Sequence, residues 1–145
     1  MARAPDRRIF LDTNILLDVL LEREAFYYDA LKIWSACEQG YAQGFISALS
    51  VNNVYYVVRR LKSEATAMVA VRILLRIFTV VPLDAQVLML ASDCHDRDYE
   101  DDVQLQSAIS RNCLELYTRD RTHYHTRALS VLPPSAFALN RGSRQ

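Results

Sequence analysis

The chain has 145 residues, of which 51% are hydrophobic and 23% charged, and this composition excludes a disordered chain and supports a single buried core. It contains only three glycines and four prolines, which disfavours a turn-rich, all-β fold. Its 17 basic and 17 acidic residues balance, so no overall field would draw the chain to nucleic acid or to an anionic membrane. Any polyanion must therefore be bound by local features.

The cysteines and the apolar runs indicate where in the cell the protein resides. Cys37, Cys94 and Cys113 are odd in number and form no CxxC pair, which is typical of buried thiols in a reducing environment. The chain has no apolar run as long as a membrane span. We expect a cytoplasmic protein.

Short apolar runs alternate with helical patterns along the chain. The run 9–11 predicts a buried strand that turns into a helix through residue 21, and a second helix is expected from Glu24 to Gln39. Further strands are predicted at residues 44–47, 79–81, 114–118 and 130–132. Helical stripes containing Val54, Ala67 and Leu105, and a helix from Asp84 to about Cys94, separate or follow them. The alternation predicts an α/β fold with a central, mostly parallel sheet that is covered by helices on both faces.

Residues 1–140 are expected to form one domain, and residues 141–145 a disordered tail. In an open parallel sheet, binding sites lie beyond the carboxyl ends of the strands.

Three acidic residues follow predicted strands or begin a predicted helix near them. Asp12 ends the first strand, Asp120 follows the strand at 114–118, and Asp101 stands in the first turn of a helix after an acidic loop. Three carboxylates about 4 Å apart would repel one another by roughly 4 kcal/mol per pair at an effective dielectric constant of about 20. A cluster of this kind needs a cation, and carboxylate oxygens favour Mg²⁺ or Mn²⁺.

Four segments resemble, in order, the motif blocks of PIN-domain nucleases, and are most similar to the VapC-like toxins of prokaryotic toxin–antitoxin systems. The segments are 10–20 (FLDTNILLDVL), 46–56 (ISALSVNNVYY), 98–104 (DYEDDVQ) and 117–120 (YTRD). This resemblance implies a three-layer α/β/α PIN-like fold. It also implies a Mg²⁺- or Mn²⁺-dependent endoribonuclease that hydrolyses RNA phosphodiesters with a metal-activated water, forms a homodimer and is inhibited by a cognate antitoxin.

The resemblance assigns the metal ligands to Asp12, Asp101 and Asp120. Asn53, or Asn52 in a register shifted by one residue, stands where the family usually has a glutamate, and we expect Asn53 to assist catalysis. The loss of one charge should weaken a second metal site, so we predict one tightly bound ion and a second that arrives with the substrate. Glu100 is a less favoured substitute for the missing acid than Asp98.

Other residues near the motifs have supporting roles in this hypothesis. Thr13, Asn14, Asp98 and Thr118 are expected to support the metal ligands, although Asp98 has the spacing of a helix N-cap to Asp101. Arg119, Arg121 and Arg127 are candidates for contacts with RNA phosphates. Tyrosines 27, 28, 55 and 56 could stack on bases, but their helical positions favour packing in the core or at a dimer interface.

Two alternative functions stay open. The chain could be a catalytically weakened PIN-like module that binds RNA or a protein, because the usual glutamate is absent. It could also be a phosphoryl-transfer or receiver-type α/β domain, which likewise gathers acids at strand ends. That class needs a lysine beside the acids, and Lys32 and Lys62 both lie away from the predicted strand ends.

Overall fold

The computed structural model describes residues 6–95, 98–124 and 126–139. The tail at 141–145 lies outside these residues. Five strands form one sheet in the order β3-β2-β1-β4-β5, and every neighbouring pair is parallel. The strands are β1 (Arg8–Leu11), β2 (Gln43–Ser47), β3 (Thr79–Val81), β4 (Glu115–Tyr117) and β5 (Ser130–Leu132). The predicted parallel α/β sheet is therefore confirmed.

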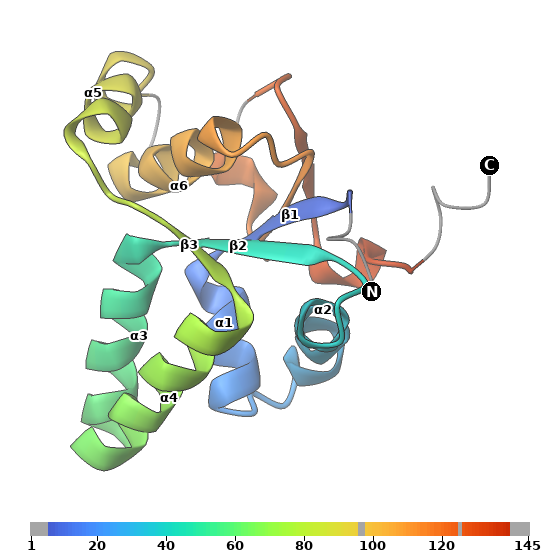
Figure 1. The fold of residues 1–145 in the computed structure, drawn as a ribbon, viewed down its shortest axis with the longest axis vertical. Helices are drawn as coiled ribbons and strands as arrows, with labels where there is room; N and C mark the ends of the chain where they lie inside the picture. The colour runs from blue at the N-terminus through green and yellow to red at the C-terminus, as the bar shows by residue number, and fades with distance from the viewer. Residues whose placement is uncertain (1–5, 96–97, 125, 140–145) are drawn as a thin grey trace.

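Helices cover both faces of this sheet, which gives three layers (Figure 1). One layer contains α1 (Thr13–Leu20), α2 (Tyr27–Glu38), α3 (Ala48–Leu61) and α4 (Glu64–Ile77), and the other contains α5 (Ala85–Asp93) and α6 (Tyr99–Ser110). Two short 3-10 turns, η1 (Arg121–His123) and η2 (Pro134–Ala136), follow β4 and β5. In the described part of the chain, no helix has the length and apolar character needed to span a membrane.

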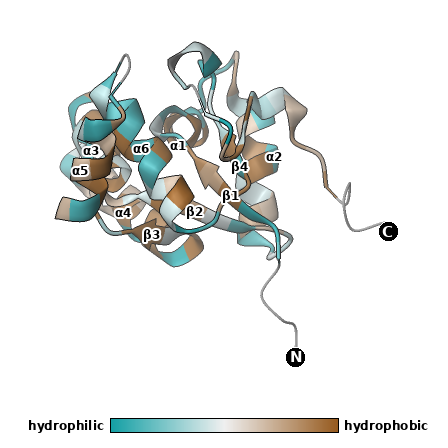
Figure 2. Cartoon of the chain, turned by 90° about the horizontal axis from the view of Figure 1, so that it is seen from above, coloured by the Kyte–Doolittle hydropathy of each residue, from teal (hydrophilic) through white to brown (hydrophobic). Residues whose placement is uncertain are grey.

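The core follows from the alternation of side chains along the strands. Ile9 and Leu11 of β1 pack into the cluster formed with α1 to α4, whereas Phe10 between them packs on the other side with Leu105 and Ala108 of α6. Figure 2 shows apolar residues concentrated where the helices meet the strands. Ile9, Phe10 and Leu11 of β1 are fully buried, and this continuous apolar run is what a central parallel strand covered on both faces requires.

Three local expectations were wrong. The second helix begins at Tyr27 rather than Glu24, because the backbone N–H groups of Phe26 and Tyr27 both donate to the carbonyl of Arg23 and form a turn there. Cys94 is exposed at the end of α5, beyond the buried face of that helix. Tyr28 and Tyr56 are 72% and 58% exposed, so neither packs in the core, whereas their packing at a dimer interface stays a prediction.

The strand register brings the first functional residues together. Leu11 of β1 is paired with Tyr117 of the neighbouring β4, and the N–H of Asp12 donates to the Tyr117 carbonyl over 3.0 Å. Asp12 and Thr118 each come directly after these paired residues. Their side chains therefore lie at the carboxyl edge of the sheet, as predicted for this fold.

Candidate functional site

A cavity of about 650 Å³ opens at the carboxyl ends of β1 and β4. It is lined by the first residues of α1, the middle of α3, the N-terminal turns of α6 and the segment after β4. The lining residues are Asp12, Thr13, Asn14, Leu17, Asn53, Tyr56, Val57, Asp98, Glu100, Asp101, Gln104, Thr118, Arg119 and Asp120. The three acids predicted to bind metal therefore line one cavity, and so do Asn53 and all four supporting residues.

Asp12 is held by three hydrogen-bond donors from different elements. Its Oδ1 accepts from the Thr13 N–H over 2.6 Å and from Gln104 Nε2 over 2.8 Å. Its Oδ2 accepts from Thr118 Oγ1 over 2.8 Å. Asp12 also serves as the N-cap of α1. Its place between the end of β1 and the start of α1 both makes it a cap and directs it to the cavity.

Gln104 and its partner Ser50 were not predicted from the sequence as site residues. Gln104 is 2% exposed and Ser50 is fully buried. The Ser50 hydroxyl donates to Gln104 Oε1 over 3.4 Å and lies 2.7 Å from the Thr13 hydroxyl. Since Gln104 Oε1 accepts from Ser50, its amide N–H groups face Asp12. This polar chain links α1, α3 and α6 beneath the cavity.

Burial dominates the electrostatics of Asp12. It raises the pKa of the Asp12 carboxyl, and hydrogen bonds from Thr118, Gln104 and Thr13 oppose the rise. The negative charge of Glu100 adds to the increase. No described Lys, Arg or His forms an ion pair with Asp12. A buried carboxylate in this position would be stabilised by a bound cation.

Asp101 lies in the first turn of α6, where Asp98 caps the helix by accepting from the Asp101 N–H over 3.2 Å. The capping interpretation of Asp98 is thus confirmed. The buried hydroxyl of Tyr124 donates to Asp101 Oδ1 over 3.3 Å. Burial, followed by the charges of Asp12 and Asp101, raises the pKa of Tyr124. Tyr124, which no sequence pattern indicated, therefore lies among acids from two elements.

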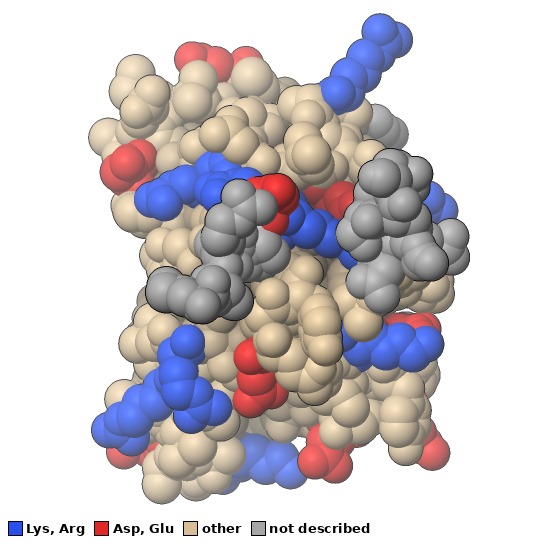
Figure 3. Space-filling view, turned by 45° about the vertical axis from the view of Figure 1, so that its right-hand side comes forward, with Lys and Arg blue, Asp and Glu red and all other residues tan. Residues whose placement is uncertain are grey.

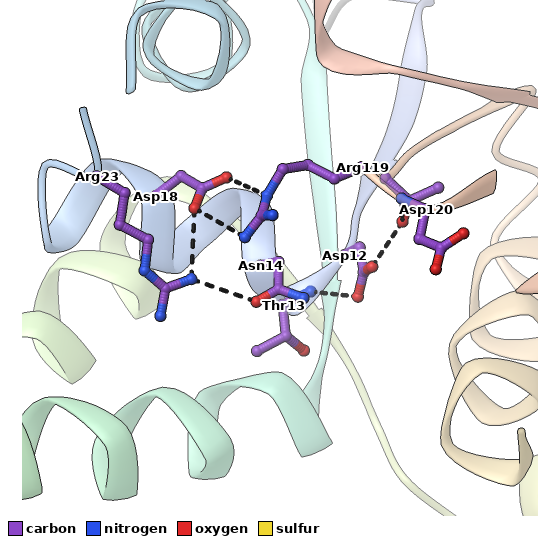
Figure 4. A network of polar contacts seen from close by, with 8 residues as sticks. Asp12, Thr13, Asn14, Asp18, Arg23, Arg119 and Asp120 are labelled. Carbon is purple, nitrogen blue, oxygen red and sulfur yellow. Dashed lines mark hydrogen bonds and ion pairs between the residues drawn. The ribbon is translucent and has the colours of Figure 1, made fainter. Parts of the chain in front are cut away.

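Asp120 and Arg119 extend in different directions from the end of β4 (Figure 4). Asp120 lines the cavity, its N–H donates to the Thr118 hydroxyl over 3.2 Å, and its Oδ1 accepts from the Thr122 N–H over 3.1 Å. Thr118 thus contacts both Asp12 and the backbone of Asp120. A supporting role of this hydroxyl at a metal site stays a prediction.

Arg119 forms an ion pair with Asp18 of α1. The Asp18 side chain is completely buried. Arg119 Nε and Nη2 donate to the two oxygens of Asp18 over 2.8 and 3.2 Å. Its guanidinium lies 3.9 Å from the centre of the Phe26 ring, and Arg23 approaches Asp18 at 3.4 Å. Figure 4 shows this network beside Asp12. Arg121 and Arg127 are exposed and do not belong to the described cavity lining.

Asn53 contacts an acid rather than replacing one. Its Nδ2 donates to Glu100 Oε2 over 2.8 Å, so α3 and the first turn of α6 are joined across the cavity. Glu100 is thereby held at the cavity next to Asn53.

The donor chemistry fits a hard divalent cation, because the candidate ligands are carboxylate and carboxamide oxygens. Among the described residues, no three His, Cys, Asp or Glu side chains are close enough together to form a ready-made metal group. The acids line a common cavity without being gathered to coordination distance. On the face in Figure 3, basic and acidic side chains are interspersed, in keeping with the balanced charge of the chain.

A family model described as PIN domain matches residues 8–122. No curated protein sequence matches the chain.

Several solved structures have a similar fold. One is FitAcB from Neisseria gonorrhoeae, with 17% identity, a TM-score of 0.68, and coverage of 89% of this chain and 99% of that chain. A toxin–antitoxin complex from Klebsiella pneumoniae is 20% identical, with a TM-score of 0.67 and coverage of 87% and 97%. VapC20 from Mycobacterium tuberculosis, a toxin that cleaves the sarcin-ricin loop, is 16% identical, with a TM-score of 0.65 and coverage of 78% and 90%.

Proposed function

Because the chain belongs to the PIN-domain family, we propose that it is a divalent-metal-dependent endoribonuclease and the toxin of a toxin–antitoxin pair. The observation that supports this most strongly is that Asp12, Asp101 and Asp120 line one cavity at the carboxyl edge of a parallel sheet. These acids are far apart in sequence, and their mutual repulsion makes it costly to bring them to one cavity. Such a cluster is therefore expected where the protein uses it to bind a cation.

Asp12, Asp101 and Asp120 would hold Mg²⁺ or Mn²⁺, and Asn53 and Glu100 would border the ion. When bound, the cation supplies a more acidic water molecule and stabilises negative charge on the phosphate. Asp12 is fixed by Gln104 and Thr118, whereas Asp101 is half-buried and Asp120 is exposed. The rigid buried acid therefore orients the site, and the two more accessible acids complete it.

The residues of the chain would perform the remaining tasks. Asp101, held by Tyr124, would accept a hydrogen bond from the attacking water and orient it. Arg119, Arg121 and Arg127 follow β4 and would contact phosphates of the RNA on either side of the cleaved bond. Cleavage would leave a 5′-phosphate and a 3′-hydroxyl.

We also propose an antitoxin partner, a homodimer and a cytoplasmic location. The antitoxin is supported by the fold similarity to the Klebsiella toxin–antitoxin complex. A basic side chain of such a partner could enter the acidic cavity and neutralise it in place of the metal.

RNA cleavage in the presence of Mn²⁺ tests the proposed activity. Wild-type protein should cleave single-stranded or structured RNA, and EDTA should abolish cleavage. Asp12→Asn should reduce the rate at least about 100-fold, because it removes a charged ligand of the ion. Asp29→Asn is the matched control, since Asp29 lies on α2 outside the cavity lining, and it should cleave like the wild type.

Two outcomes would contradict the nuclease proposal. Equal cleavage by the wild type and Asp12→Asn would identify a contaminating nuclease. RNA binding without cleavage by the wild type would favour the catalytically weakened binding module.

A further inference from the structure

The cavity lining contains a second group of residues that the metal chemistry does not use. Leu17 of α1 and Tyr56 and Val57 of α3 line the same cavity as the acids. Asn53, Tyr56 and Val57 are spaced by three and four residues, so they lie on one face of α3. The cavity therefore combines an acidic part with an aromatic and aliphatic part.

Tyr56 is an exposed aromatic residue at this position. Its side chain is 58% exposed, although a tyrosine on an amphipathic helix can usually bury its ring against neighbouring elements. The ring of Tyr55 packs edge-on against it, with centroids 5.5 Å apart and an interplanar angle of 73°. Tyr55 is half-buried, and its hydroxyl donates to Glu64 over 3.4 Å. Tyr56 is thus supported from one side and open on the other.

The charge of the cavity makes an aromatic contact valuable. Five acids line it, namely Asp12, Asp98, Glu100, Asp101 and Asp120. The one basic residue in the described lining is Arg119, which uses two of its nitrogens for Asp18. Coulomb forces from the described lining residues therefore oppose the entry of a phosphate backbone. Attraction that does not depend on charge must contribute to substrate binding.

We infer that Tyr56 is a base-stacking residue, which holds an unpaired base of single-stranded RNA beside the cluster of acids. This inference rests on the proposed function and adds a substrate contact to it. Aromatic side chains bind nucleic acid by stacking on base faces, and only an unpaired base presents a free face. A base on Tyr56 would place the adjoining sugar and phosphate toward the acids that line the same cavity.

The inference is tested by RNA binding without metal or cleavage. The affinity of a fluorescently labelled, single-stranded RNA oligonucleotide is measured by anisotropy in EDTA. Tyr56→Leu should weaken binding about 10-fold, because it removes the aromatic face while keeping an apolar side chain. Tyr56→Phe should bind like the wild type, since stacking needs the ring and not the hydroxyl.

Tyr28→Leu is the matched control, because Tyr28 is 72% exposed on α2 and lies outside this cavity. It should leave RNA affinity unchanged. An oligonucleotide of equal length with abasic positions should bind the wild type and Tyr56→Leu equally, which separates base stacking from contacts with the sugar–phosphate chain.

Equal affinity of Tyr56→Leu and the wild type for the base-containing RNA would overturn the inference. A change in oligomeric state of Tyr56→Leu without a change in RNA affinity would also overturn it, because Tyr56 would then belong to a protein interface. Since EDTA removes metal from every sample, a failure of the nuclease proposal would appear in the cleavage assay and not in this binding assay.

Discussion

Asp12 is surrounded by donors that leave it little freedom to rotate. Gln104 and Thr118 are 2% and 1% exposed, and each donates to a different oxygen of the carboxylate. Ser50 fixes the orientation of the Gln104 amide by donating to its oxygen. Residues that donate hydrogen bonds to a metal ligand commonly affect metal affinity, although they do not contact the ion.

Gln104→Met should weaken Mn²⁺ binding about 10-fold, because methionine fills a similar volume and cannot donate a hydrogen bond to Asp12. Isothermal titration calorimetry measures the affinity directly. Gln106→Met is the control on the same helix, since Gln106 does not line the cavity. Unchanged Mn²⁺ affinity in Gln104→Met would show that Thr118 and the Thr13 N–H are sufficient to position Asp12.

Asp12→Asn should raise the melting temperature of the metal-free protein at neutral pH by a few degrees. The folded protein then no longer contains a buried negative charge, and the Thr118 hydroxyl can accept from the new amide. Because burial raises the pKa of Asp12, the folded state binds its proton more readily than the unfolded state does. The wild type therefore gains stability as the pH falls through the raised pKa, and the advantage of the variant should shrink.

Calorimetric melting curves over a range of pH in EDTA check this sign. A variant that melts below the wild type at neutral pH would mean that the hydrogen bonds of the carboxylate outweigh the cost of burying its charge.

The Asp18–Arg119 ion pair joins helix α1 to the segment that follows β4. Asp18 is completely buried, and Arg119 directly precedes Asp120. The pair therefore fixes the start of the segment that brings Asp120 to the cavity. A buried carboxylate that loses its partner is costly, because the charge has no water to replace the lost interaction.

Arg119→Met should destabilise the protein by about 2 kcal/mol in urea unfolding, because the buried Asp18 carboxylate then keeps only its longer, 3.4 Å contact with Arg23. The double variant Asp18→Asn with Arg119→Met should recover part of that loss, since the buried charge is then gone. Arg121→Met, two residues along the chain and exposed, should change stability by less than about 0.5 kcal/mol. A similar small effect for Arg119→Met would contradict a structural role for the pair.

The elements were predictable from local sequence patterns, and the contacts around the site were not. The runs at 79–81 and 130–132 coincide with β3 and β5, the two edge strands of the sheet, because short apolar runs rich in β-branched residues and bounded by turn residues favour strands. The role of Gln104 was not predictable, because it depends on which face of α6 meets the ends of β1 and β4. Periodicity alone does not specify that face. Tyr56 was assigned to packing for a related reason, since helical spacing does not distinguish a face that meets the core from one that lines a cavity.

The charges of the whole molecule balance, but the fold places an excess of acidic side chains at the cavity. The chain has equal numbers of acidic and basic residues, yet five acids and one arginine line the cavity. The parallel sheet produces this imbalance, because the segments carrying Asp12 and Asp120 both leave the same edge and α6 brings Asp101 to it. We propose that this edge binds one divalent ion through Asp12, Asp101 and Asp120.

A crystal structure of the protein soaked with Mn²⁺ would test this metal site, because anomalous scattering locates the ion independently of the protein atoms. We predict one strong peak in the cavity, within coordination distance of oxygens from Asp12, Asp101 and Asp120. A cavity without a peak, or an ion bound elsewhere on the chain, would contradict it.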